Sequence, residues 1–263
     1  NAFSHSARQA GPSDILYPTA EPRALSGSNK VCSNNTRKSV RNHRRFLLTS
    51  CILMSSLTYR TAGESHGPAL LALIEGMPAG VPVDKDLIDT ELRRRQGGYG
   101  RGGRQKIETA AVQILSGVRR GKTIASPIAL EIVNKDSRLD DAPALHRPRP
   151  GHADLAGSIK WLTTDCRETL ERASARETAA RVAAGALVRS LLREFNINVF
   201  AYVLSIGSVS AKIDWSKPLA ELTSLRDQGD LFKEWVGCPD ESAAKKMRDE
   251  IQKAKQAGDT LGG

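Results

Sequence analysis

The sequence SARETAARVAAGALVRSLLREF (residues 174–195) holds the clearest helical pattern in the chain, and the fold is best understood outward from it. Ser174 and Glu177 form an S-x-x-E capping box, which is typical of the first turn of a helix. Apolar residues then recur at helical spacing and predict the buried face: Val182, Leu187, Leu191 and Leu192. We therefore expect a long helix packed against the core.

Stretches before this helix have the character of strands. SLTYRTAG (56–63) alternates apolar and polar residues, and ALLALIEGMPAGVPV (69–83) predicts a buried strand that ends in a Gly/Pro turn. AAVQILSGVRRGKTIASPIALEIVN (110–134) contains two strand-like runs around the turn GVRRGK. Between them, residues 84–96 predict a helix with Asp84 as N-cap and an apolar stripe made of Leu87, Ile88 and Leu92.

After the central helix, residues 197–210 predict a strand and residues 241–258 a charged amphipathic helix. Residues 97–104 are a glycine-rich basic loop. Residues 135–157 are long, polar and rich in proline, and loops of that length are usually functional or disordered. Strands and helices alternate without a βαβ rhythm, and no G-x-G-x-x-G follows a strand, which argues against a Rossmann domain.

The composition is that of an ordinary soluble globular protein. The 263 residues suffice for one large domain or two small ones, with 40% hydrophobic and 26% charged residues. Aromatic residues make up only 5%, so stacking platforms for nucleic acid are not indicated. The four cysteines are scattered without a CxxC pair, which favours neither a disulfide framework nor a zinc site and suits a reducing compartment.

The net charge of +10 is concentrated at the beginning of the chain. Residues 1–53 hold eight basic and two acidic residues and contribute +6, so the other 210 residues carry only +4. Mild basicity of this larger part suits a small polyanionic substrate as well as it suits DNA.

Residues 1–53 are rich in Ser, Asn and Arg and predict a disordered extension. Three interpretations compete for this segment: a transit peptide, a secretory signal in which Cys51 resembles a lipoprotein cleavage site, or upstream sequence from an over-long gene prediction. We favour the last, with the natural start at Met54. The apolar run of residues 46–57 is too short to span a membrane, so no membrane association is expected.

Two histidines lie in flexible, polar loops beside carboxylates. His66 is in TAGESHGP (61–68), where small neighbours let a ligand approach, and histidine can exchange protons near neutral pH. His152 follows RPRPG, whose prolines stiffen the loop, and Asp154 is placed to orient its imidazole. The competing interpretations are a surface-loop histidine for His66 and a solvated basic loop for His152.

Arginines gather in RRRQGGYGRGGR (93–104), where guanidinium groups suit phosphate and carboxylate. An RGG-type RNA-binding segment is the alternative, although the tract is short and occurs once. The predicted helix start at Ser174 offers free backbone N–H groups to a cofactor phosphate, or is simply a well-capped helix.

Several of these stretches, in the same order, resemble chorismate synthase. The resemblance covers about residues 55–263 and is carried by TAGESHGPALLALIEGMPAGVPV, RRRQGGYGRGGR, ILSGVRRGKTIASPIALEIVNKDSR, RPRPGHADLAG and ERASARETAARVAAGAL. It implies a lyase that converts 5-enolpyruvylshikimate-3-phosphate (EPSP) to chorismate and phosphate by 1,4-anti elimination, in the shikimate pathway of aromatic amino acid biosynthesis. The family requires reduced FMN, and some members reduce it with NADPH.

The resemblance also implies roles for individual residues. His66 would protonate the reduced flavin or tune its charge, and His152 would act as general acid toward the phosphate. Substrate anions would be bound by Arg95, Arg101, Arg149, Ser174 and Arg176. The flavin would contact Ala173, Ser174 and Ala175, and Arg95 and Arg101 match positions related to cofactor and NADPH binding. No metal is implied.

The fold implied by the resemblance is an α+β sandwich with helices between two antiparallel sheets, assembled as a homotetramer. The enzyme would be cytoplasmic, or plastidial if residues 1–53 are a transit peptide, and would bind neither nucleic acid nor membrane. The family continues well past GDTLGG (258–263). Residues 54–263 are therefore expected to be a C-terminally truncated domain that is inactive or nearly so.

Overall fold

The structure is a computed structural model, and it describes residues 56–100, 108 and 111–263. The predicted extension of residues 1–53 lies outside the described residues, as do Arg101 and Arg104 of the arginine-glycine loop.

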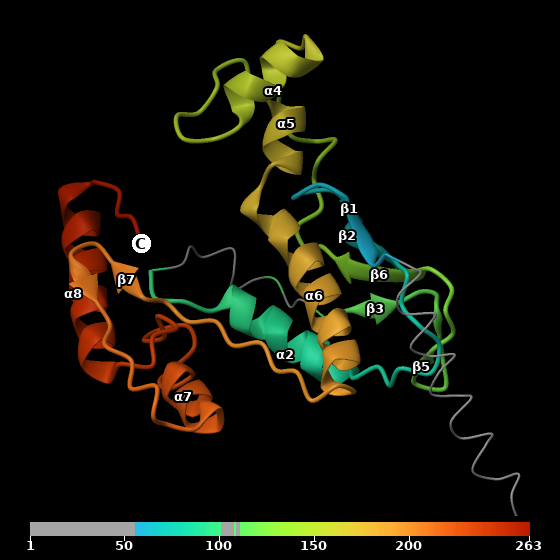
Figure 1. The fold of residues 1–263 in the computed structure, drawn as a ribbon. Helices are drawn as coiled ribbons and strands as arrows, with labels where there is room; N and C mark the ends of the chain where they lie inside the picture. Colours follow the sequence, from blue (N-terminus) through green and yellow to red (C-terminus); the bar gives the residue numbers. More distant parts are fainter. Residues whose placement is uncertain (1–55, 101–107, 109–110) are drawn as a thin grey trace, which may run out of the picture. The chain divides into compact units, whose positions relative to one another are not determined.

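A four-stranded antiparallel sheet forms the base of the fold, with strand order β1-β2-β6-β3 (Figure 1). The strands are β1 (Thr58–Ala62), β2 (Ala69–Glu75), β6 (Ile128–Val133) and β3 (Gln113–Ile114). β1 and β2 are consecutive and pair directly, so the segment that contains His66 closes a β-hairpin. The strands predicted in residues 56–63, 69–83 and 110–134 are confirmed.

One face of this sheet is buried because its strands alternate as a half-covered sheet requires. In β2, Leu70, Ala72 and Ile74 are buried, whereas Leu71 and Leu73 point away and are 40% and 39% exposed. The neighbouring strand β6 contributes Ile128, Leu130 and Ile132 to the same face. These side chains form the main hydrophobic core together with two helices.

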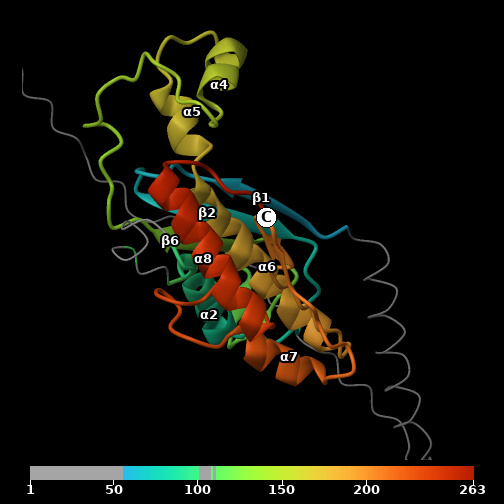
Figure 2. The ribbon, with the colours of Figure 1, turned by 90° about the vertical axis from the view of Figure 1, so that its left-hand side faces the viewer.

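The two helices are α2 (Lys85–Gln96) and α6 (Thr178–Arg193), which lie side by side (Figure 1), with α6 packed against β2 and β6 (Figure 2). Both were predicted. In α2, the Asp84 carboxylate accepts the backbone N–H of Leu87 at 2.9 Å, so the predicted N-cap is confirmed. Ile88 and Leu92 are fully buried, as the apolar stripe requires.

The buried face of α6 differs from the predicted one. Of the four apolar residues expected there, only Leu187 is fully buried, while Val182, Leu191 and Leu192 are partly exposed. The rest of the buried face is made of small residues, namely Ala179, Ala180, Ala183, Ala184, Ala186 and Ser190. Small side chains let the helix approach the sheet closely, and a search for leucine and valine alone overlooks them.

The predicted capping box is also wrong in detail. Residues Ala175–Glu177 form a 3-10 turn, η1, before α6 begins. The Ser174 hydroxyl accepts the backbone N–H of Arg176 at 3.3 Å and so caps this turn. The Glu177 carboxylate is bound instead by Thr61 Oγ1 at 2.5 Å and by Arg181 Nε at 2.8 Å. The Glu177 carboxylate therefore does not cap the helix, because it is hydrogen-bonded to β1 and to Arg181.

The segment between β6 and α6 is only partly a loop. Residues 135–157 were predicted to be loop throughout, but α4 (Asp154–Trp161) begins inside that range and is followed by α5 (Arg167–Arg172). Gly157 of α4 lies against Thr169 of α5, and this contact between the two helices is absent from any local sequence pattern. The turn GVRRGK itself forms a small hairpin of β4 (Val118–Arg119) and β5 (Lys122–Thr123).

The strand predicted over residues 197–210 is mostly wrong. Only β7 (Ser205–Ile206) and β8 (Val209–Ser210) form, as a two-residue-per-strand hairpin that turns at Gly207 with φ +57°. A short helix α7 (Leu219–Arg226) was not predicted. The helix α8 (Glu241–Ala257) is confirmed, and it ends at Gly258 in the left-handed conformation typical of a C-cap.

The described residues thus form an α+β fold. They contain one four-stranded sheet and two short two-stranded ribbons, so helices held between two full sheets stay a prediction. Within the described part of the chain, no helix combines the length and the apolar character needed to cross a bilayer.

Candidate functional site

The loop that carries His66 connects β1 to β2 and is fixed at both ends. Gly63 has φ +94°, and a Cβ there would lie 2.2 Å from the Ala69 carbonyl oxygen, so only glycine fits. The side-chain amide of Asn134 donates to the carbonyl oxygens of Glu64 at 3.0 Å and Gly67 at 2.8 Å. The backbone around His66 is therefore held in one shape by the core strand β6 and its C-terminal neighbour Asn134.

His66 is bound on one side by Glu171 of α5. Its Nδ1 lies 2.7 Å from Glu171 Oε2, and its backbone N–H donates to the same oxygen at 3.1 Å. The backbone N–H of Ser65 donates to the Glu171 carbonyl oxygen at 3.0 Å. The Glu171 side chain is fully buried, whereas that of His66 is 18% exposed.

On its other side His66 faces Asp136, with Nε2 and Oδ2 3.5 Å apart. Each carboxylate also has an arginine: Asp136 pairs with Arg138 at 3.1 Å, and Glu171 with Arg167 at 3.4 Å. The charges thus alternate from Arg167 to Arg138 through a central imidazole. The imidazole of His66 therefore lies between two carboxylates, each of which has an arginine partner of its own.

His152 has a different carboxylate partner. Its Nδ1 lies 2.5 Å from Oδ1 of Asp154, whose other oxygen accepts the Arg149 side chain and backbone N–H, each at 3.0 Å. Burial alone would raise the pKa of Asp154, but these hydrogen bonds outweigh it and lower the pKa from 3.8 to about 2. Asp154 is therefore ionised at neutral pH and orients both His152 and Arg149.

The two histidines are linked by the chain and not by direct contact. The segment that ends at His152 begins against His66, whose carbonyl oxygen accepts the backbone N–H groups of Arg138 at 2.9 Å and Leu139 at 3.0 Å. Among the described residues, no hydrogen bond or ion pair joins His66 to His152. The partner of His152 is Asp154, as the sequence predicts. The partners of His66 are Glu171 and Asp136, which are distant from it in the sequence.

The helix start that was predicted to contact a cofactor lies next to Arg95, which was predicted to bind substrate and cofactor. Arg95, at the end of α2, donates from Nε to Thr178 Oγ1 at 2.9 Å and from Nη2 to the Ala175 carbonyl oxygen at 2.5 Å. Ser174 donates to the Ser65 hydroxyl at 3.1 Å. The structure therefore brings Arg95, Ser174 and Ala175 together with the histidine loop.

Arg176 lies elsewhere in this arrangement, inside the protein. Its guanidinium donates to Asn134 Oδ1 at 3.0 Å and pairs with Glu108 at 3.3 Å. Because Asn134 holds the histidine loop, Arg176 supports that loop from within. Arg172, which the sequence did not single out, binds the carbonyl oxygens of Thr61 at 2.9 Å and Gly63 at 3.2 Å.

A cavity of about 620 Å³ opens between α4 and α5. Its lining includes Ala153, the neighbour of His152, and Ala173, a predicted flavin contact. Lys160 and Arg172 supply positive charge, Glu168 supplies a carboxylate, and Trp161 supplies an aromatic wall. The volume and the mostly apolar lining with few charged groups are those of a small-molecule site.

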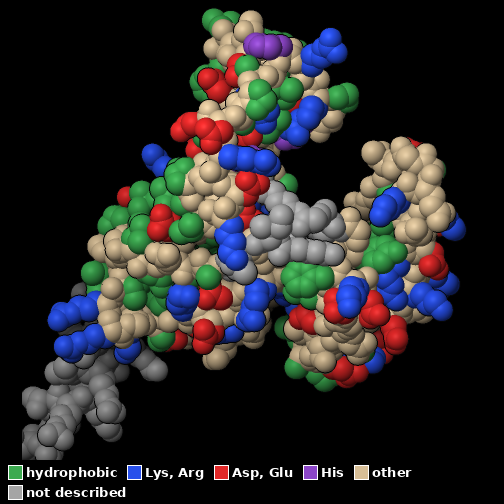
Figure 3. Space-filling model, turned by 180° about the vertical axis from the view of Figure 1, so that it is seen from behind, with side chains coloured by type: hydrophobic (Ala, Val, Ile, Leu, Met, Phe, Trp, Pro, Cys, Tyr) green, Lys and Arg blue, Asp and Glu red, His purple; other side chains and the backbone are tan. Residues whose placement is uncertain are grey.

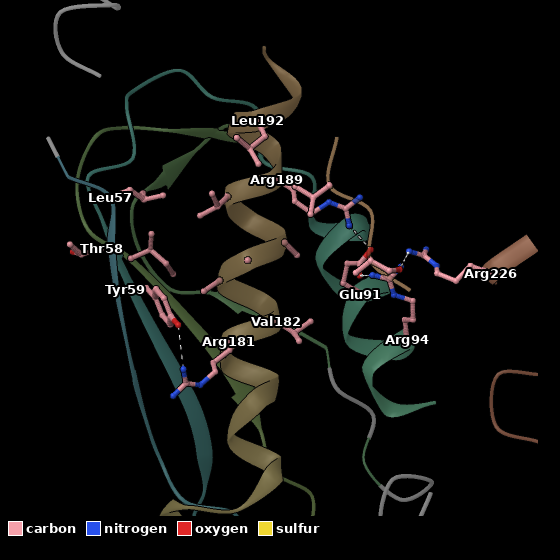
Figure 4. Close-up of a pocket in the computed structure, with 17 residues that line it drawn as sticks. Leu57, Thr58, Tyr59, Glu91, Arg94, Arg181, Val182, Arg189, Leu192 and Arg226 are labelled. Carbon is pink, nitrogen blue, oxygen red and sulfur yellow. Dashed lines mark hydrogen bonds and ion pairs between the residues drawn. The ribbon is translucent and has the colours of Figure 1, made fainter. Parts of the chain in front are cut away.

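The surface around these elements is not strongly basic. Figure 3 shows Lys and Arg side chains interspersed with Asp and Glu on the face it presents. A second cavity of about 600 Å³ lies beside α6, lined by residues of α2, α6 and β1 (Figure 4). There Glu91 lies between Arg94 and Arg189 and pairs with both, and Tyr59 accepts a hydrogen bond from Arg181 at 3.3 Å.

Sequence reasoning missed the polar residues that hold the histidine loop: Glu108, Asn134, Asp136, Glu171 and Arg172. All but Glu108 lie in stretches that were interpreted in another way from the sequence, and Glu171 is three residues before the predicted helix start. In the sequence, each is only a polar residue near the end of a helix or strand. Nothing in such a position indicates which distant residue it will contact.

The chain is similar to known proteins over most of its length. The model of the chorismate synthase family matches residues 57–263. The chorismate synthase of Desulforamulus reducens is 50% identical over 219 residues, covering 79% of this chain and 55% of that protein. That of Symbiobacterium thermophilum is 49% identical over 224 residues, covering 79% and 56%. A crystal structure of chorismate synthase has a TM-score of 0.58 at 38% identity, covering 80% of this chain and 56% of its own. The chain spans about half the length of the curated relatives it matches.

Proposed function

Because the chain belongs to the chorismate synthase family, we propose that it contributes the proton-handling part of a lyase that converts EPSP to chorismate and phosphate. The reaction is a 1,4-anti elimination, in which a ring proton and the phosphate leave and a second ring double bond forms. The observation that carries the proposal is the placement of His66 in a rigid loop between two carboxylates. Such a group can hold and release a proton near neutral pH.

We assign the second proton-handling role to His152. Its imidazole is oriented by the ionised carboxylate of Asp154, and the neighbouring Arg149 guanidinium is held by the same carboxylate. A departing phosphate gains negative charge, so a nearby cation and a proton donor both lower the barrier. His152 and Arg149 would supply these two functions from one short segment.

The residues present fit reduced FMN. The cavity of about 620 Å³ lies within the usual range for such ligands, and it combines Ala173 with an aromatic wall, two cations (Lys160 and Arg172) and one carboxylate (Glu168). When bound, the flavin would lend electron density as the C–O bond to phosphate breaks. The chain's own part would be to hold the cofactor at Ala173, Ser174 and Ala175, with His66 as the group that exchanges a proton with it. NADPH as reductant belongs to the same proposal.

Substrate anions would be bound by arginines. Arg95, which is half-buried, and Arg149, which is exposed, are the described candidates, because hydrogen bonds to the protein hold each guanidinium in place. Arg176 supports this role less directly, since its side chain is only 6% exposed and is paired with Glu108. We propose that Arg176 shapes the loop that carries His66.

We also propose that a second sheet covers the far side of α2 and α6, giving the sandwich of the family. The cavity beside α6 supports this, because Leu57 and Val199 line it and are 41% and 57% exposed. A homotetramer is part of the same proposal, and sedimentation of a protein that contains both sheets would test it.

A chimera gives the direct test of the reaction. Residues 57–263 would replace the matching region of the Desulforamulus reducens enzyme, which supplies the rest of that protein. Phosphate release from EPSP would be measured anaerobically with chemically reduced FMN. The proposal predicts release that depends on both EPSP and reduced flavin, at a rate close to that of the unmodified relative.

The unmodified Desulforamulus reducens enzyme serves as the positive control, and the 263-residue chain alone is assayed beside them. A folded chimera that binds reduced FMN and releases no phosphate would refute the proposal. In that case residues 57–263 would not supply the proton-handling function that they replace in the relative.

A further inference from the structure

We propose that Glu171 is a positioning residue that holds His66 in the tautomer with its proton on Nδ1, so that Nε2 is the nitrogen that gains and loses a proton. The relevance of this inference to catalysis rests on the proposed function. The geometry that carries it is independent of any reaction.

The tautomer follows from counting donors at one oxygen atom. Glu171 Oε2 accepts the backbone N–H of His66, and Nδ1 of the same residue lies 2.7 Å away. The other oxygen, Oε1, lies 3.4 Å from an Arg167 guanidinium nitrogen, which can only donate. Both carboxylate oxygens therefore act as acceptors, and Nδ1 must carry the hydrogen that it shares with Oε2.

Burial makes this hydrogen bond costly to lose. The Glu171 side chain has no exposed surface, and a buried carboxylate without partners is strongly unfavourable. Its partners are Arg167 and His66, and Arg167 is the more distant one. The hydrogen bond from Nδ1 is therefore strongly maintained, which fixes both the tautomer and the plane of the ring.

The other ring nitrogen has a different environment. Nε2 lies 3.5 Å from Asp136, which is 27% exposed and is shared with Arg138. This distance is longer than a strong hydrogen bond, so the proton on Nε2 is held less firmly than that on Nδ1. A ring with one tightly bound and one loosely bound proton exchanges only the second, which defines the direction of transfer.

Glu171 also supports the loop through its backbone, and this makes its side chain testable. The carbonyl oxygen of Glu171 accepts the Ser65 N–H, and Asn134 holds the loop from the opposite side. Neither contact needs the carboxylate. Changing the side chain of Glu171 should therefore alter the state of His66 and leave the loop anchored.

The experiment is nitrogen-detected NMR of the imidazoles in the full 263-residue chain, labelled with 15N, at a pH where His66 is neutral. The His66 signals are identified by their loss in His66→Ala. In the unmodified chain we expect the Nδ1–H tautomer to dominate. Glu171→Ala should shift the population to the Nε2–H tautomer that isolated histidine prefers, whereas Asp136→Asn should leave Nδ1–H dominant.

Glu171→Gln separates hydrogen bonding from charge, because glutamine keeps an acceptor oxygen for Nδ1–H. It should keep the Nδ1–H tautomer that Glu171→Ala loses. A dominant Nε2–H tautomer in the unmodified chain would overturn the inference, as would an unchanged tautomer in a folded Glu171→Ala protein. The unmodified chain gives a decisive result even if Glu171→Ala fails to fold.

The chimera connects the tautomer to turnover. There, Glu171→Ala should lower kcat by about 10²-fold with little change in KM, because proton transfer is affected more than binding. Glu171→Gln should recover part of this loss. If the unmodified chimera releases no phosphate, the proposed function fails, while the NMR result still decides the role of Glu171.

Discussion

The side chains of Arg176 and Glu108 form an ion pair of 3.3 Å in which they are only 6% and 2% exposed. Arg176 also donates to Asn134, whose amide holds both ends of the loop that carries His66. A buried ion pair and the loop that carries His66 are thus connected through one asparagine. The arginine that resembles a substrate ligand in sequence has a structural position in the molecule.

The first prediction follows from this burial. Arg176→Met leaves the Glu108 carboxylate buried without its guanidinium, and breaking such a pair costs about 3–5 kcal/mol of the free energy of unfolding. Urea denaturation of the full chain measures the loss. Arg181→Met is the matched control, because the Arg181 side chain is 55% exposed and the Glu177 carboxylate keeps its hydrogen bond from Thr61, so we expect a loss of about 1 kcal/mol or less. A loss below about 1 kcal/mol for Arg176→Met would contradict the structural role.

The second prediction concerns acid stability. The pKa of Asp154 falls from 3.8 to about 2 on folding, so the unfolded chain binds the proton more readily. The stabilisation by Asp154 is fully present above pH 3.8 and is lost as the pH falls toward about 2. We expect the difference in unfolding free energy between the unmodified chain and Asp154→Asn to shrink over this range.

Urea titrations at several pH values measure that difference. Other carboxylates titrate in the same range but are common to both chains, so subtraction removes them. A difference that stays constant from neutral pH to the bottom of the range would show that Asp154 is not held ionised by Arg149 and His152.

The third prediction compares two helical glycines. A Cβ at Gly157 would lie 2.1 Å from Thr169 Oγ1 and 2.6 Å from its Cβ, whereas a Cβ at Gly185 meets no atom within 4 Å. Gly157→Ala should therefore lower the free energy of unfolding by about 1–3 kcal/mol through overpacking of α4 against α5. Gly185→Ala should raise it by about 0.5–1 kcal/mol through helix propensity.

Thermal or urea denaturation distinguishes these opposite signs. Equal effects of the two substitutions would show that α4 and α5 are not packed as described, and the cavity between them would then need another explanation.

The fourth prediction concerns the histidines themselves. In the chimera, His66→Ala and His152→Ala should each lower phosphate release by about 10²-fold or more, the range expected for a lost acid or base. His146→Ala is the control, because His146 lies in the same long segment, is exposed, and lies 3.1 Å from the Thr164 carbonyl oxygen. A His146→Ala variant as impaired as His152→Ala would point to damage of the loop and not to lost acid–base chemistry.

Local chemistry explains which elements the sequence could predict. Helix α2 and its cap at Asp84 depend on residues within one turn of each other, and the β1 and β2 strands depend on simple alternation. The strand expected over residues 197–210 is wrong, because Gly207 reverses the chain and the flanking residues pair only with each other. The apolar β-branched residues of this segment match the composition of a strand, but the segment does not pair with the main sheet.

The site divides in the same way. His152 and Asp154 are two residues apart, so their pairing could be proposed from the sequence. Glu171 is 105 residues from His66, and nothing in either stretch indicates the other. Likewise, Glu177 had a local use in a capping box, and its contacts with Thr61 and Arg181 were not foreseeable without the packing of α6 on β1.

The distance along the chain between His66 and Glu171 has a consequence for the order of events during synthesis. At about 5–20 residues per second, a ribosome needs roughly 5–20 s to add the 105 residues that separate them. For that time the hairpin of β1 and β2 can form while its loop lacks the carboxylate that binds the imidazole. The histidine is therefore made early and gains its Nδ1 hydrogen-bond partner late, when α5 has left the ribosome and docked.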